Sequence, residues 1–196
     1  LKSDLNPLEG ELLTGMFRSQ LPKMDNTNFI VEYNALKADD APATLTQNEM
    51  MRRMKEMSAM QPGMNFYGQM PDMFSLVVNT EQPAVRRLVK TAEETVGKEV
   101  TPLRQKIDEL DNAIKALRDV KPEADEAAEA KADREKEIAD KERELSGIRS
   151  QEEDLVAAYA AKVPEIRQII DLALLKAGML KGEALAAFIR RSVSLL

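Results

Sequence analysis

The sequence contains no cysteine and no histidine. The first absence excludes disulfide bonds and thiolate chemistry, and it suits a reducing compartment. The second removes the side chain that most often serves as a general base near neutral pH and as a metal ligand. A glycine-rich phosphate loop and a Gly-x-Ser-x-Gly elbow are missing too. We therefore expect no catalytic residue, no metal site and no cofactor in this chain.

Excess positive charge and long apolar runs are also lacking. The formal net charge is −6, whereas a nucleic-acid-binding surface needs an excess of Lys and Arg. No apolar run approaches the roughly 20 residues that cross a bilayer, and no signal peptide is evident. We expect a cytoplasmic protein without nucleic acid or a membrane as a stable partner. The chain begins with Leu1 rather than Met, so we expect a segment of a longer protein.

Local signals predict an α+β fold in which a small three-stranded sheet packs with helices. Asn6, Pro7 and Glu9 have the pattern of a capped helix start, and this helix should end before Pro22. Short apolar runs predict strands over residues 28–33, 43–45 and 73–78. Hydrophobic residues make up 43% of the chain, which is enough for a packed core.

A capping box is predicted between the second and third strands. Thr46 and Glu49 have its spacing, and Leu45 and Met50 occupy the positions of a hydrophobic staple. This pattern predicts a helix from Gln47 to Met60. Pro83 then opens a further helix, which follows the third strand.

A heptad-like pattern begins near Lys98. Its outgoing arm carries apolar residues at alternating spacings of four and three, at Leu103, Ile107, Leu110, Ile114 and Leu117. A returning arm repeats the pattern at Ile138, Leu145, Ile148 and Leu155. We predict an antiparallel coiled-coil hairpin inserted over residues 98–160, with two unpaired solvated helices as the alternative.

Two helices are expected at the end of the sequence, over residues 164–178 and 182–196, with Gly178 as a C-terminal cap. They carry more apolar surface than two short helices can bury against each other. Burial in a four-helix bundle with a second copy is the favoured explanation, and packing on the chain's own sheet is the alternative. The predicted dimer interface comprises Ile166, Ile169, Ile170, Leu172, Ala173, Leu174, Leu175, Leu185, Phe188, Ile189, Val193 and Leu196.

Eight of the eleven methionines lie between positions 50 and 73. Met50, Met54 and Met57 have the spacing of a core-facing stripe, but Met51 and Met60 widen the methionine arc to about 180°. Part of that arc should be exposed, and flexible thioethers suit a surface that accepts many apolar partners. Ordinary core and promiscuous contact surface both remain open. The contact surface would comprise Met50, Met51, Met54, Met57, Met60, Met64, Phe66 and Tyr67.

Several stretches resemble the C-terminal domain of the bacterial ninety-kilodalton heat-shock chaperone family. The most specific are residues 47–57 and 61–68 (QNEMMRRMKEM and QPGMNFYG) and residues 167–175 (RQIIDLALL). Residues 20–25, 179–185 and 188–192 fit the same pattern in the same order. The similarity covers nearly the whole chain, and only the charged hairpin exceeds the compact family pattern.

The resemblance implies a homodimeric, ATP-driven chaperone of which this segment is the last domain. ATP and magnesium would bind a missing N-terminal domain. The closing helices would form the dimer interface, and Met50, Met54 and Met57 would contact unfolded or partly folded client proteins, with cochaperones as candidate partners. We expect a core over residues 1–97, the hairpin over 98–160 and dimerisation helices over 161–196. A structural coiled-coil scaffold without client binding is the alternative function.

Overall fold

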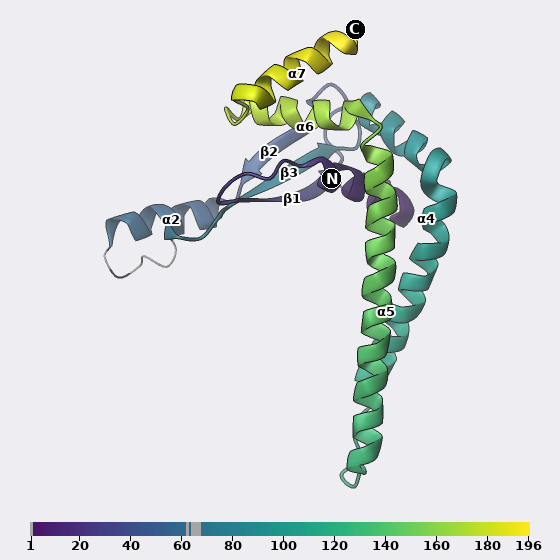
Figure 1. Cartoon of the computed structure of the whole chain (residues 1–196). Coiled ribbons are helices and arrows are strands. Elements are labelled where there is room, and N and C mark those ends of the chain that lie inside the picture. Colours follow the sequence, from purple (N-terminus) through teal and green to yellow (C-terminus); the bar gives the residue numbers. More distant parts are fainter. Residues whose placement is uncertain (1, 62, 64–67) are drawn as a thin grey trace.

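The computed structural model describes residues 2–61, 63 and 68–196. It is an α+β structure, as predicted, with a small sheet at the centre of Figure 1. The elements in chain order are α1 (Pro7–Gln20), β1 (Thr27–Asn34), β2 (Ala43–Gln47), α2 (Glu49–Met60), β3 (Asp72–Asn79), α4 (Pro83–Arg118), α5 (Ala128–Ala160), α6 (Pro164–Lys176) and α7 (Gly182–Ser194). In Figure 1, α2 extends to one side of the sheet, α4 and α5 run downward together, and α7 lies outermost, beyond α6.

The sheet has the strand order β1–β3–β2, with β1 parallel and β2 antiparallel to β3. Asn79, which is fully buried at the end of β3, fixes the connection between the two outer strands. Its side-chain oxygen accepts a hydrogen bond from the Leu36 N–H at 3.1 Å, and its amide nitrogen donates to the Lys37 carbonyl at 2.7 Å. A buried amide with these partners holds the loop against the sheet without leaving a polar atom unpaired.

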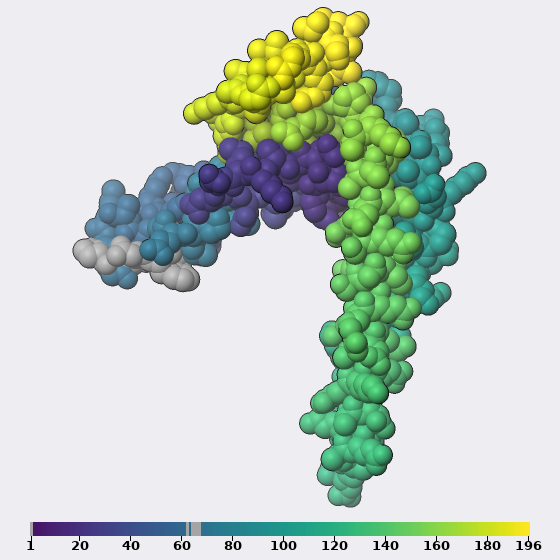
Figure 2. All heavy atoms as spheres, viewed as in Figure 1, coloured from purple at the N-terminus to yellow at the C-terminus, as the bar shows by residue number. Residues whose placement is uncertain are grey.

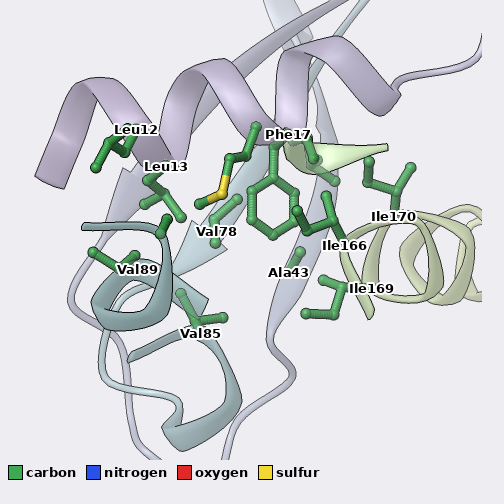
Figure 3. Packing of buried hydrophobic residues seen from close by; sticks show 14 of the residues in the cluster. Leu12, Leu13, Phe17, Ala43, Val78, Val85, Val89, Ile166, Ile169 and Ile170 are labelled. Atoms are coloured by element: carbon green, nitrogen blue, oxygen red, sulfur yellow. The ribbon is translucent and has the colours of Figure 1, made fainter. Parts of the chain in front are cut away.

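The hydrophobic core lies between α1, one face of the sheet, and the helices α4 and α6 (Figure 3). From α1 it receives four side chains without exposed surface, namely Leu12, Leu13, Met16 and Phe17. They meet residues of the sheet, of α4 and of α6, among them Val78, Val85, Val89, Ile166 and Ile170. A Cβ on Gly10 would lie 2.5 Å from the Tyr33 hydroxyl, so glycine lets α1 approach β1 closely.

The helices α4 and α5 form the predicted antiparallel hairpin, which projects far from the core in Figure 2. Ile107, Leu110 and Ile114 are buried between its arms, and the returning-arm residues predicted to face them are half-buried. Ion pairs also join the arms, including Arg149 to Asp111 at 3.1 Å and Lys106 to Glu144 at 3.6 Å. Whether the hairpin is a coiled-coil insertion stays a prediction.

The base of the hairpin is continuous with the core. The helix α4 runs through positions 97 and 98 without a break, and Val100, Val156 and Ala160 belong to the core cluster. The predicted first boundary therefore falls inside a helix. The division of the chain into three parts stays a prediction about domains.

Two capping predictions have different outcomes. Gly178, at φ +72°, follows the end of α6, and the Met179 N–H donates to the Leu174 carbonyl at 2.8 Å, which confirms the predicted cap. The capping box at Thr46 is wrong, because β2 continues to Gln47 and pairs there with β3. The cap of α2 is Asn48, whose side-chain oxygen accepts a hydrogen bond from the Met51 N–H at 3.1 Å.

Glu152 is a buried carboxylate where the hairpin joins α1. Arg104 donates to its two oxygens at 3.3 and 3.2 Å and also lies 3.6 Å from Glu11. Burial raises the pKa of Glu152 above its ordinary value, and the nearby Arg104 opposes this only in part. The charged carboxylate is therefore disfavoured at this place in the fold.

This raised pKa predicts a pH-dependent contribution to stability. Near and above the ordinary pKa of about 4.5, the folded chain binds the Glu152 proton more strongly than the unfolded chain does, so stability falls as pH rises through this window. Glu152→Gln removes the titration. The unfolding free energy of the wild type minus that of the variant should decrease between about pH 4 and pH 7, as measured by urea unfolding. A difference that is constant or increasing with pH would contradict this assignment.

Candidate protein-binding surfaces

The helix α2 exposes its methionines. In this helix, all of which the structure describes, Ser58 is the one buried residue. Met50, Met57 and Met60 are 71%, 52% and 85% exposed, while Met51 and Met54 are half-buried. The core explanation of the stripe is therefore wrong, and the predicted exposure of the arc is confirmed. Of the other predicted contact residues, Met64, Phe66 and Tyr67 lie outside the described residues.

The opposite side of α2 attaches the helix to the protein. Lys55 forms an ion pair of 2.9 Å with Asp72 at the start of β3. Ser58, whose hydroxyl donates within the helix to the Lys55 carbonyl, packs against Gly68, where a Cβ would lie only 3.2 Å from that hydroxyl. These contacts involve one edge of the helix. They turn Met50 and Met57 away from the sheet, since residues seven apart share a helix face.

Ion pairs between side chains of α2 stabilise the helix, which has little hydrophobic packing of its own. Arg52 pairs with Glu49 at 2.5 Å and also with Glu56, and Arg53 pairs with Glu49 at 3.1 Å. The two arginines hold the pKa of Glu49 down at about 2. Such pairs three and four residues apart stabilise an exposed helix. The methionine surface, defined here as Met50, Met54, Met57 and Met60, is thus carried by a helix that does not need those side chains for its own packing.

The closing helices divide the predicted dimer residues into two groups. Ile166, Ile169, Ile170, Ala173 and Leu174 are buried in the chain's own core. One face of α6 packs on α1 and β2, so these five side chains have no surface left for a partner. Their assignment as interface contacts is corrected accordingly. For this face, the alternative of packing on the chain's own sheet was right.

The second group faces outward or lies between α6 and α7. Leu185 and Phe188 are half-buried against the core cluster. The exposed residues, called the outer apolar residues below, are Leu172, Leu175, Ile189, Val193 and Leu196. The helix α7, described over its full length, contains no buried side chain and lies on the surface in Figure 2. Exposed apolar residues in such number are unusual on a chain that acts alone.

A buried ionic network fixes α7 on α6. Asp171 is only 1% exposed and accepts hydrogen bonds from Arg167 at 3.0 Å and from Arg191 at 3.1 Å. Arg191 also donates to Gln168 at 3.0 Å, and Arg167 donates to the Gln20 carbonyl at 2.8 Å. The network joins α1, α6 and α7. No sequence prediction covered this network, although the spacing of Arg167 and Asp171 within an apolar helix was a signal.

The described residues contain no helix long and apolar enough to cross a membrane. Within the same residues, no group of acidic side chains could hold a metal ion. A polar hollow lined by Glu11, Arg18, Arg104, Glu152 and neighbouring residues has oppositely charged groups facing one another. These observations direct attention to the two apolar surfaces.

Comparison with known proteins finds relatives that share one name, chaperone protein HtpG. The protein of Bacteroides thetaiotaomicron is 40% identical over 192 residues, which are 96% of this chain and 28% of the relative. The protein of Bacteroides fragilis is 38% identical over 196 residues, which are 100% of this chain and 29% of the relative. The protein of Porphyromonas gingivalis is 40% identical over 198 residues, which cover 98% of this chain and 28% of the relative. No family model and no solved structure matches the chain.

Identity at this level over nearly the whole chain confirms the resemblance found in the sequence. The chain is similar over nearly its whole length to part of the ninety-kilodalton heat-shock chaperones. Its relatives within that family are the bacterial HtpG proteins, and it spans 28–29% of their length.

Proposed function

We propose that this chain is the C-terminal dimerisation and client-binding domain of a cytoplasmic HtpG chaperone. One observation carries the proposal: the chain presents two apolar surfaces, on α2 and on α7, that nothing in its described part covers. ATP and magnesium would bind in another domain of the parent protein, where hydrolysis would drive the conformational cycle. The domain itself would act by binding.

The methionine surface has the chemistry expected of a site for unfolded protein. Methionine side chains are unbranched and polarisable, so they adapt to apolar segments of varied shape. Affinity at one such helix is low, because few side chains are involved. A dimer holds two copies of α2, and a client long enough to reach both binds more tightly through the raised effective concentration of the second site.

The outer apolar residues favour self-association. In a twofold-symmetric dimer, α6 and α7 of one copy would pack with the same helices of the other as a four-helix bundle. Asp171 and Arg191 support this arrangement, since they hold α7 in place and so present Ile189 and Val193 on a defined surface. Association costs less entropy when the contacting helix is already ordered.

Dimerisation is tested by Ile189→Glu combined with Val193→Glu. Burying each aliphatic side chain contributes about 1.5–3 kcal/mol, and a symmetric interface contains each residue twice. The dissociation constant of the dimer should therefore rise at least about 100-fold, as measured by sedimentation equilibrium. Truncation before α6 would be uninformative because it removes Ile166 and Ile170 from the core.

Val120→Glu, at an exposed apolar position in the hairpin loop, is the matched control and should leave the dimer unchanged. A double variant that dimerises as tightly as the wild type would exclude α7 as the interface.

Client binding is tested by Met50→Gln combined with Met57→Gln. Glutamine keeps the length and helix propensity of methionine but removes its apolar surface. Loss of two partly buried contacts should weaken binding of a permanently unfolded protein, such as reduced and alkylated α-lactalbumin, at least about 10-fold. Fluorescence anisotropy of the labelled client measures this. Met50→Leu with Met57→Leu should retain binding, and equal affinity for the glutamine variant would refute the proposed site.

The projecting hairpin favours the second candidate function, a scaffold whose partner binds the coiled coil. Replacing residues 112–147 with a short glycine-serine linker separates the two functions, because Val100, Val156 and Ala160 stay in the core. A client-binding dimerisation domain should stay dimeric and keep its affinity for the client after this change. Loss of binding to a partner of the hairpin, in a shortened chain that is still dimeric and still binds α-lactalbumin, would support the scaffold.

A further inference from the structure

We propose that the methionine surface is a site of reversible oxidation, at which a peroxide converts thioethers to sulfoxides and so lowers the affinity for clients. The inference rests on the proposed client binding and adds a means of regulating the same helix. Its starting point is a contrast within the chain. Met50, Met57 and Met60 expose half or more of their surface, whereas Met16 in α1 exposes none.

The chemistry requires nothing beyond a peroxide. The thioether sulfur attacks the O–O bond and takes one oxygen atom, so methionine becomes its sulfoxide and hydrogen peroxide becomes water. Sulfur loses two electrons and the peroxide gains them. The chain contains no cysteine, so methionine provides all of its sulfur atoms and no thiol competes for the oxidant. Sulfoxide reductases reverse the reaction at the expense of a thiol pair.

The attachment of α2 allows this reaction without unfolding. The helix is held by the ion pair of Lys55 with Asp72 and by the close approach of the buried Ser58 to Gly68, and neither contact involves a methionine sulfur. Its ion pairs lie at Arg52 and Arg53. At about 100° per residue, Met50 and Met57 lie within roughly 20° of each other and roughly 80–100° from Ser58. Oxygen atoms added on this side point into solvent rather than into the core.

The oxidised sulfur atoms of these methionines determine how the reaction changes the affinity for clients. A sulfoxide is polar, so each one withdraws apolar surface from the helix face that clients would contact. Several such groups on one short helix act on a single binding event. The core is protected, because Met16 is enclosed by α1 and its neighbours. The oxidised chain therefore keeps its fold and its dimer but binds apolar segments weakly.

The first measurement is a time course of the intact chain in hydrogen peroxide, followed by peptide mass spectrometry. Met50, Met57 and Met60 should form sulfoxide at least about 10-fold faster than Met16. Equal rates at exposed and buried positions would overturn the inference.

The second measurement is binding of labelled, reduced and alkylated α-lactalbumin before and after mild oxidation. Affinity should fall at least about 10-fold and return after treatment with methionine sulfoxide reductases. Circular dichroism and sedimentation should show an unchanged fold and dimer.

The decisive control is the triple variant Met50→Leu, Met57→Leu and Met60→Leu, because leucine preserves apolar volume but cannot accept oxygen. This triple variant should bind the client both before and after treatment with peroxide. If the triple variant loses binding in peroxide as the wild type does, or if the oxidised wild type binds as tightly as the reduced one, the oxidation site is wrong and the proposed function stands. If the reduced wild type does not bind, the proposed function fails and this inference with it.

Discussion

The packing of α1 into the space between the sheet and the helices is the interaction on which the rest of the structure depends. Leu12, Leu13, Met16 and Phe17 are enclosed there, and every other core element contacts them or their neighbours (Figure 3). Because a three-stranded sheet alone buries little apolar surface, this helix supplies the centre that α4, α5 and α6 surround. The sheet, the base of the hairpin and α6 are thereby held in one arrangement.

This central packing also explains why two other elements are left uncovered. Once α1, α4 and α6 occupy one face of the sheet, the short α2 lies beyond the start of β3 and contacts the core hardly at all (Figure 1). Likewise, α6 uses its inner face for the core, so α7 can pack only on what remains. The apolar residues on α2 and α7 are then available to other molecules. A buried aspartate fixes the position of α7 together with Leu185 and Phe188, which pack against the core cluster.

Sequence patterns predicted the elements better than the directions in which they face. The strands, the hairpin and the cap at Gly178 follow from local rules of spacing, turn chemistry and left-handed backbone, and they were correct. The stripe of Met50, Met54 and Met57 shows that one side of α2 is apolar, but periodicity does not say what that side faces. For α6, apolar residues surround most of the helix, so no pattern could separate Ile170, which is in the core, from Leu172, which is outside. The predicted cap at Thr46 failed because Thr46 and Gln47 pair with β3, a contact distant in sequence.

The unbroken course of α4 gives the hairpin a mechanical property. The helix has 36 residues, of which the first half packs in the core and the second half lies in the projecting arm. A long helix anchored in this way behaves as a lever whose fulcrum is near Val100, close to Pro102 inside the helix. At 1.5 Å per residue the free arm extends roughly 27 Å beyond that point, so a tilt of about 10° displaces its tip by roughly 5 Å. Force applied at the far end of the hairpin is thus transmitted, with mechanical advantage, to the side chains around α1.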